Sequence, residues 1–521
     1  MRASIAAGAV PVESPAPLSS ATRSATLFAV GALLIVALAL RAPYFGNPDI
    51  HVDEEFYALV ADQMWKGALP YVDIWDRKPI GLFLIYALFR PISGASLIDV
   101  QLLGLICAWG TAMLIWVMAR RYTQSSLALF PAILYLFWQG VFEGFSAQSP
   151  VFYNFPMALA ALLCLRATDR SDGKNLIGIG VAAMALVGLS IQIKYTAIFE
   201  GFFFGLWLVW LRFRMCRSFA AIAGPAFLWV MTALAPTLAV AASYAMMGHW
   251  AAFAQANFTS IFLRARLEAT YLASLQAFVA IAGLPLLVTA LAGLAGHICF
   301  ERTPRPDRWF LLGWLISALC GFTAIGNFYH HYALPLLPPL LVVASRCFMK
   351  RMSAGLIFLS LAAWASIWWP PRPADATMRS RATIARLASA AKPYLRYGPM
   401  FIWDGPSILY VAVDATPPTR FAYPDHLSNV VEKDALGADT GKEIRKILAQ
   451  RPAIIVSSSS GLIPRYNPVT HHLIQAALAR DYIEMNRQVA GWGNRDYILY
   501  ARRDLVHSLS TKRGGEPSLN S

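Results

Sequence analysis

Apolar segments long enough to cross a membrane recur along this chain and restrict it to a bundle of membrane helices. A spanning helix needs about 20 mostly apolar residues. Runs of this kind lie near the following positions: 24–41, 99–118, 125–141, 150–166, 176–193, 196–211, 219–247, 273–295, 309–325, 332–345 and 353–370. Only 14% of the residues are charged, whereas a soluble domain carries about 25%. We expect a mainly α, polytopic bundle with roughly eleven spans.

Basic residues gather in the short loops between these runs, and the formal net charge is +15. The clusters are Arg120 and Arg121; Arg166, Arg170 and Lys174; Arg212, Arg214 and Arg217; Arg302, Arg305 and Arg308; Arg346, Lys350 and Arg351. Because cytoplasmic loops carry excess Lys and Arg, we interpret them as cytoplasmic loops and expect membrane lipids, not nucleic acid, around the protein. The pattern predicts an integral protein of a bacterial inner (plasma) membrane, with the N-terminus cytoplasmic and the C-terminal region outside.

Composition divides the chain into four parts. Residues 1–23 are rich in Ala, Pro and Ser and are expected to form a disordered cytoplasmic tail, followed by a retained first span. Residues 24–370 form the transmembrane module, whose first external loop is 42–98. Residues 371–505 are expected to form an extracytoplasmic α/β domain, and 506–521 a polar tail. Within that domain, expected helices at 378–392, 439–450 and 469–480 alternate with expected strands at 399–403, 452–457 and 496–501.

The segment 51–79 of the first external loop is a charged island in an apolar chain. Asp53, Glu54 and Glu55 come just before an amphipathic helical pattern that is suited to the membrane surface and ends at Gly67. Such acids often cap a helix and complement its dipole, but a carboxylate here can also take a proton from an attacking hydroxyl. The pair Arg77 and Lys78 can extend toward lipid headgroups or hold a leaving phosphate.

The residues of this loop resemble a known pattern. The pattern D-E-x-x-Y-A, then G-x-x-x-Y-x-D-x-W-D-x-K-P, resembles the GT-C class of membrane glycosyltransferases, and especially the protein mannosyltransferase and aminoarabinose (lipid A) transferase families. Two weaker similarities are FYHHYALPLLPPL at 328–340 and LSIQIKYTAIF at 189–199. The residues that carry the loop pattern are Asp53, Glu54, Tyr57, Ala58, Gly67, Tyr71, Asp73, Trp75, Asp76, Lys78 and Pro79.

The resemblance implies transfer of a sugar from a polyprenyl-phosphate donor to an envelope acceptor (lipid A or lipopolysaccharide, another glycan, or a protein) on the external face. It assigns the catalytic base to Asp53, with Glu54 beside it, and the donor phosphate to Lys78. Tyr57, Asp73 and Asp76 fall among the substrate-binding residues. A single displacement with one base would invert the anomeric carbon.

One position departs from the family pattern. Pro150 stands where these families often place a second acid, and Glu143, earlier in the same loop, is a substitute. The sequence shows no required cofactor. A divalent metal is possible, and His51 with Asp53 and Glu54 is the group that we considered for it, although their spacing is not diagnostic.

Other candidates lie in later loops, each with an ordinary alternative. Arg264 and Arg266 could bind an anion or form a salt-bridged turn with Glu268. Lys194, between two apolar runs, could contact the substrate or extend to the interface. The resemblance favours His331 and Tyr332 as donors to sugar or phosphate, although an aromatic-belt position explains them equally.

Two rival functions remain open on the sequence. A secondary transporter of a lipid-linked or anionic solute would show paired halves and mid-membrane charges, and neither feature is evident. A non-catalytic envelope-assembly protein would tolerate the loss of charge at Asp53 and Lys78.

Overall fold

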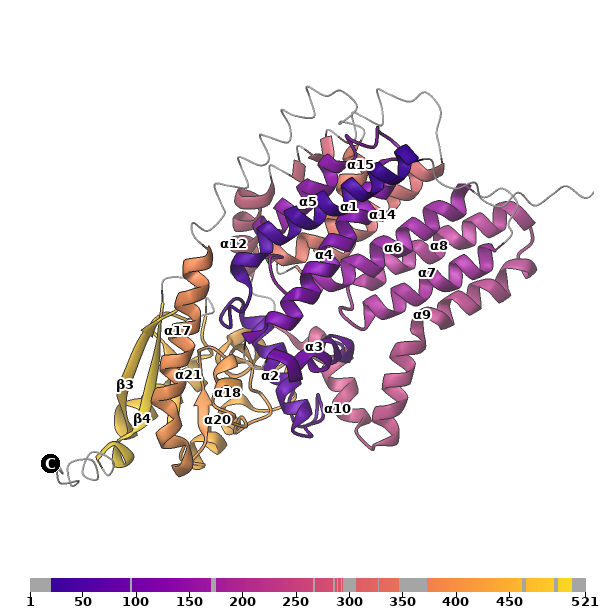
Figure 1. The fold of residues 1–521 in the computed structure, drawn as a ribbon. Coiled ribbons are helices and arrows are strands. Elements are labelled where there is room, and N and C mark those ends of the chain that lie inside the picture. Colours follow the sequence, from indigo (N-terminus) through magenta and orange to yellow (C-terminus); the bar gives the residue numbers. More distant parts are fainter. Residues whose placement is uncertain are drawn as a thin grey trace, which may run out of the picture.

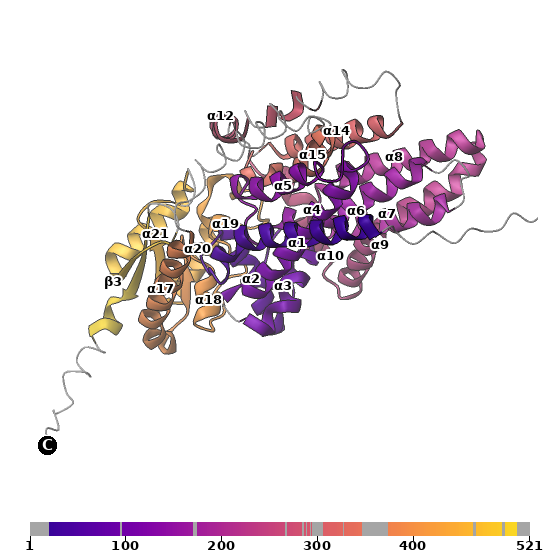
Figure 2. The same cartoon turned by 45° about the horizontal axis from the view of Figure 1, so that its top comes forward.

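The structure is a computed structural model, and it describes the following residues: 20–93, 96–169, 175–265, 268–283, 286–287, 289–291, 293, 306–326, 328–345, 373–461, 465–491 and 495–507. A helical bundle occupies one side of the molecule and a sheet-containing domain the other, with the helices of the first external loop between them (Figure 1). The same arrangement is seen in the turned view (Figure 2).

The bundle consists of helices from the N-terminal two thirds of the chain. Its described helices are α1 (Ser20–Arg41), α4 (Ile98–Ala119), α5 (Leu129–Val141), α6 (Ser149–Asp169), α7 (Leu176–Ile191), α8 (Ala197–Cys216), α9 (Ala220–Met246), α12 (Glu268–Phe278), α14 (Pro306–Ile325) and α15 (Leu337–Ala344). Helix α6 packs against α4, α7 and α8, and α7 packs against α9. Short elements complete this part: η1 (Ala42–Tyr44), α10 (Trp250–Ala254), η3 (Gln255–Thr259), α11 (Ser260–Leu263), η4 (Val279–Gly283) and η5 (His330–Leu336).

Four of the described helices are long and apolar enough to cross a membrane by length and composition. They are Arg23–Tyr44, Ile98–Ala119, Ser149–Asp169 and Ala220–Met246. Shorter apolar helices account for several other expected spans, while the expected span 353–370 lies outside the described residues. The mainly α fold is confirmed, and the number of spans stays a prediction.

The first external loop forms two helices, α2 (Val52–Trp65) and α3 (Ile80–Ser93), that pack against each other. The expectation of a surface helix over α2 is wrong. Its residues 54–63 are all buried, because α3 covers one side and α18 (Ile408–Ala412) of the C-terminal domain covers another. Acidic residues in such a helix need protein partners, since water does not reach them.

The C-terminal domain contains a four-stranded mixed sheet in the order β1-β2-β4-β3. The strands are β1 (Met400–Ile402), β2 (Ile454–Ser458), β3 (Tyr482–Val489) and β4 (Asp496–Arg502). β1 pairs with β2 in parallel, with Ile402 opposite Val456, and the other two pairings are antiparallel. The apolar run Ile454, Ile455 and Val456 is fully buried, as expected for a central strand.

Helices and short turns surround this sheet. They are α17 (Pro373–Ala391), η7 (Lys392–Tyr397), α18, α19 (Pro424–Ser428), η8 (Val430–Glu432), α20 (Thr440–Ala449) and α21 (Pro468–Asp481). The three expected helices and three expected strands of this domain are therefore confirmed, and β3 is an additional strand.

Buried polar contacts fix the C-terminal domain to the first external loop. Asp49, just before α2, accepts hydrogen bonds from the Tyr497 hydroxyl (2.8 Å) and the Gly491 backbone N–H (3.2 Å). The Trp75 backbone N–H donates to the Arg420 carbonyl at 2.8 Å. The domain thus forms one wall of the space around α2.

Candidate active site

The candidate base Asp53 lies in the first turn of α2. The helix is capped by His51, whose side chain accepts a hydrogen bond from the Asp53 backbone N–H at 3.2 Å. Asp53 is therefore not the capping residue, and its carboxylate is available for other partners. That side chain is 15% exposed, so it is accessible yet largely surrounded by protein.

Lys78 is the principal cation beside Asp53. Its Nζ lies 3.5 Å from Asp53 Oδ1 and 3.2 Å from Asp76 Oδ2. Burial disfavours both charges, but the opposite charges outweigh burial, so the pKa of Asp53 lies below its usual range and that of Lys78 lies above. The pair is thus ionised at neutral pH. A carboxylate can take the proton of one substrate's hydroxyl, and an ammonium group beside it can hold the phosphate of the other substrate.

Two tyrosines enclose Lys78. Its Nζ lies 5.0 Å from the ring centre of Tyr57 and 5.4 Å from that of Tyr423, and aromatic faces attract cations at this range. The Tyr423 hydroxyl donates to Asp53 Oδ1 at 3.1 Å. Burial raises the pKa of Tyr423 well above its usual range, which keeps this hydroxyl protonated as a donor.

Two other predicted acids of the loop point elsewhere. Glu54 is buried, and its Oε2 accepts from the Ser146 hydroxyl (2.6 Å) and the Ala147 backbone N–H (3.0 Å). Asp73 is exposed and accepts from the Leu69 backbone N–H at 2.8 Å, as a turn residue does. In this structure Glu54 therefore secures the next external loop, and Asp73 closes a turn.

Glu143 and three histidines form a group next to Asp53. His330 Nδ1 and His331 Nδ1 lie 3.3 and 3.2 Å from the two Glu143 oxygens. His51 Nε2 lies 3.9 Å from Glu143 Oε2, and His331 Nε2 lies 3.9 Å from Asp53 Oδ2. Burial opposes the ionisation of Glu143, but the histidines lower its pKa well below the usual range. Glu143, the acid that the sequence offers in place of one near Pro150, therefore lies in the histidine group beside the candidate base Asp53.

The same group has the composition of a metal site. One ligand atom each of His51, Glu143 and His331 lies within 4.8 Å of the others, and imidazole with carboxylate suits Zn²⁺ and similar ions. This set shares only His51 with the group that we considered on the sequence, because Asp53 and Glu54 face Lys78 and Ser146 instead.

Lys194 lies in the turn between α7 and α8. Its Nζ is 3.8 Å from the ring centre of Tyr332, whose ring in turn makes an edge contact with His331 at 4.7 Å between ring centres. Burial lowers the pKa of Lys194 to about 7. The loops at 194 and 329–332, which carry the two weaker similarities in the sequence, thus meet beside Asp53.

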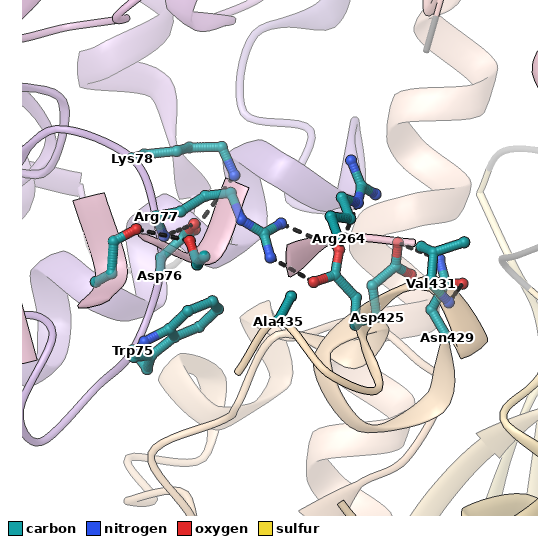
Figure 3. A network of polar contacts seen from close by, with 12 residues as sticks. Trp75, Asp76, Arg77, Lys78, Arg264, Asp425, Asn429, Val431 and Ala435 are labelled. Carbon is teal, nitrogen blue, oxygen red and sulfur yellow. Dashed lines mark hydrogen bonds and ion pairs between the residues drawn. The ribbon is translucent and has the colours of Figure 1, made fainter. Parts of the chain in front are cut away.

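A second basic group, next to Lys78, contacts the C-terminal domain. Arg77 and Arg264 both pair with the carboxylate of Glu432, and Figure 3 shows the two arginines beside the segment that carries Asp425 and Val431. The Ala265 backbone N–H also donates to the Val431 carbonyl at 3.1 Å. Of the two arginines predicted for this loop, Arg264 belongs to this cluster, and Arg266 lies outside the described residues.

Sequence reasoning missed the contribution of the segment 420–435. The local pattern around Arg420, Tyr423 and Asp425 predicts no more than a polar turn or an acceptor contact, and nothing in the sequence marks Glu432. Tyr423 and Glu432 reach the first external loop only through the fold, because more than 300 residues separate Tyr423 from Asp53 and Glu432 from Arg77. The segment FAYPDHL, with Pro424 and Asp425 at its centre, predicts a turn. It does not indicate which residues that turn contacts.

Comparison with known proteins gives one family match and several matches in fold. Residues 77–240 match the family model described as dolichyl-phosphate-mannose-protein mannosyltransferase. ArnT from Cupriavidus metallidurans, solved with undecaprenyl phosphate bound, aligns with a TM-score of 0.58 and 14% identity over 92% of this chain and 98% of that one. No curated protein sequence matches the chain.

A second solved structure shares the fold at greater distance. The oligosaccharyltransferase of Archaeoglobus fulgidus, in its apo form, aligns with a TM-score of 0.52 and 13% identity over 84% of this chain and 70% of that one. At these identities the likeness concerns the fold alone, and the family match covers residues 77–240. Both comparisons agree with the resemblance seen in the sequence: residues 77–240 are similar to the mannosyltransferase family, and the chain has an ArnT-like GT-C fold.

Proposed function

We propose that the protein transfers a sugar from a polyprenyl-phosphate-linked donor to an envelope acceptor on the external face of a bacterial inner membrane. The single observation that carries this proposal is the ionised Asp53–Lys78 pair, with 3.5 Å between Nζ and Oδ1, inside a GT-C fold. The undecaprenyl phosphate bound to ArnT of the same fold supports a polyprenyl phosphate as the carrier. The acceptor is a lipid, a glycan or a protein.

In the proposed reaction, Asp53 removes the proton from the acceptor hydroxyl as its oxygen attacks the anomeric carbon. The bond between that carbon and the phosphate oxygen breaks, and the electron pair stays on the phosphate. Lys78 holds this oxygen as its charge grows, which is the role that preformed cations fill in such transition states. Arg77 and Arg264 hold the other phosphate oxygens. A single displacement inverts the anomeric centre.

The remaining residues position these groups. Tyr57 and Tyr423 flank Lys78, and Asp76 shares its ammonium group with Asp53. His331, Tyr332 and Lys194 line the same space from the bundle side, where they are suited to bind the sugar. We propose that Glu54 acts through the loop at 146–147, and that the basic loops lie in the cytoplasm, so that this site faces outward.

Consumption of the donor separates this proposal from a transporter. Purified protein in proteoliposomes is given a labelled polyprenyl-phosphate sugar and an extract of envelope acceptors. We expect the label to appear in a glycolipid, glycan or protein, and mass spectrometry of envelopes with and without the protein to identify the acceptor. Movement of an intact solute across the vesicle, with no covalent transfer, would favour the transporter instead.

A further inference from the structure

Glu432 lies between two guanidinium groups, at a position where an incoming phosphate would also bind. It is the last residue of η8, and its side chain is only 2% exposed. Its Oε1 lies 3.0 Å from Arg77 Nη1 and 2.8 Å from Arg264 Nε, and its Oε2 pairs with Arg77 Nη2. This two-point geometry is the one with which arginine binds carboxylates and phosphates alike.

The charges around Glu432 leave a limited positive surplus. Arg77 and Arg264 contribute two positive charges and Glu432 one negative charge. Burial, with the charge of Glu432 nearby, raises the pKa of Asp425 to about 7, so this second carboxyl adds less than a full charge at neutral pH. An arriving anion therefore meets a surplus of at most about one charge at the arginine pair, where two bare guanidinium groups would offer two.

The phosphate gains charge during the proposed reaction. A polyprenyl-phosphate sugar is a phosphodiester with one negative charge, whereas the polyprenyl phosphate left after transfer is a monoester with about −1.5 to −2 charges at pH 7. The proton lost by the acceptor hydroxyl goes to Asp53, and the electron pair of the broken bond stays on the phosphate. The leaving lipid is thus attracted more strongly than the donor to any fixed cation.

We propose that Glu432 is a counter-ion that tunes the Arg77–Arg264 pair, so that the donor binds and the more highly charged polyprenyl phosphate is released. This inference rests on the proposed function. Repulsion by a fixed negative charge scales with the charge of the ligand, so Glu432 weakens binding of the monoester more than that of the diester. A residue of the C-terminal domain thereby controls product release from a site built mainly by the first external loop.

The test measures how tightly two lipids inhibit the purified protein in nanodiscs, namely a polyprenyl phosphate and its methyl diester, which carries one charge. In Glu432→Gln we expect both inhibition constants to fall, on the order of threefold for the diester and tenfold for the monoester, because the second effect is about the square of the first. The donor KM and kcat should both fall, since the product is retained. Glu484→Gln removes an exposed acid paired with Arg487 on β3 and should change neither constant.

A double variant guards against misfolding of the single one. Arg77→Gln/Glu432→Gln keeps the net charge of the cluster, so its monoester-to-diester ratio should stay near that of the wild type, while Arg77→Gln alone should weaken the monoester more than the diester. The inference is overturned if Glu432→Gln changes both lipids equally or weakens them, or if the double variant behaves like Arg77→Gln. If the wild type binds polyprenyl phosphate no better than uncharged polyprenol, it is the proposed function that fails.

Discussion

The Tyr423 hydroxyl donates a hydrogen bond to Asp53 Oδ1 at 3.1 Å, although 370 residues separate the two in sequence. Tyr423 belongs to the C-terminal domain and Asp53 to the first external loop. Asp53 therefore gains this hydrogen bond only when the domain is docked against the loop. A hydrogen bond to the charged form favours ionisation. The domain therefore supplies a direct contact to the candidate base as well as covering α2.

Removal of this hydroxyl should shift the pH profile of the enzyme. In Tyr423→Phe, Asp53 loses a donor to its ionised form, so its pKa rises and the acidic limb of kcat/KM moves to higher pH. We expect a loss of about tenfold at neutral pH, mainly from poorer positioning. Tyr466→Phe removes a similar Tyr–Asp contact within the C-terminal domain and should leave the profile unchanged. An acidic limb at or below its original position would contradict this role.

Lys78 should be needed for both the charge of Asp53 and the stabilisation of phosphate. Lys78→Met leaves two carboxylates, Asp53 and Asp76, without their shared cation, so the pKa of Asp53 should rise and kcat/KM should fall by about 10²–10³. Lys78→Arg should recover part of the activity. Lys66→Met breaks comparable pairs with Asp62 and Asp414 and serves as the control. Retention of full activity by Lys78→Met would remove Lys78 from the mechanism.

Glu143 combines a contact with the candidate-site residue His331 and a strained backbone. Its φ of 55° lies in the left-handed region, which non-glycine residues adopt at a cost. Glu143→Gly should therefore be more stable than Glu143→Gln by roughly 1 kcal/mol. Both variants should lose activity, on the order of tenfold or more, because each removes the carboxylate beside His331. Thermal unfolding and transfer assays measure the two effects separately. Full transfer activity in Glu143→Gly would show that the Glu143 carboxylate is not needed for the reaction.

Asp425 should make the protein less stable as the pH rises. Burial raises its pKa to about 7, whereas the unfolded carboxyl titrates near 3.9. Between these values the folded protein holds a proton that the unfolded chain has lost, so stability declines from about pH 4 to pH 7 and stays lower above. Asp425→Asn should raise the Tm at pH 8 by roughly 2–4 °C and change it little near pH 4. Asp481→Asn, at an exposed position paired with Arg480, should give no such gain, and a destabilised Asp425→Asn at pH 8 would refute the assignment.

Much of the architecture could be predicted from local patterns. Apolar runs predicted the helical bundle, because span length and hydropathy are properties of contiguous residues. The β-branched run IIVSS predicted the buried strand β2, while β3 was missed because its residues YIEMNRQV mix exposed polar and apolar side chains. The burial of α2 was missed because it depends on α18, a helix contributed by a distant part of the chain.

The candidate site was predictable only in part, for the same physical reason. Asp53 and Lys78 share one loop and one recognisable pattern, and the structure brings them to 3.5 Å. The placement of Tyr423 beside Asp53, and of Glu432 beside Arg77 and Arg264, depends on how the C-terminal domain docks, which no local pattern records. Glu54, adjacent to Asp53 in sequence, points elsewhere, because neighbouring residues on a helix lie about 100° apart.

The central claim is that the Asp53 carboxylate is the catalytic base. The most direct test is single-turnover transfer of a labelled sugar from a polyprenyl-phosphate donor by purified Asp53→Asn protein, beside wild type and Glu484→Gln. Because Asn is nearly isosteric but cannot accept the proton, the transfer rate should fall by about 10³ or more, while donor binding and Tm stay near those of the wild type. Transfer by Asp53→Asn at the wild-type rate would contradict the claim.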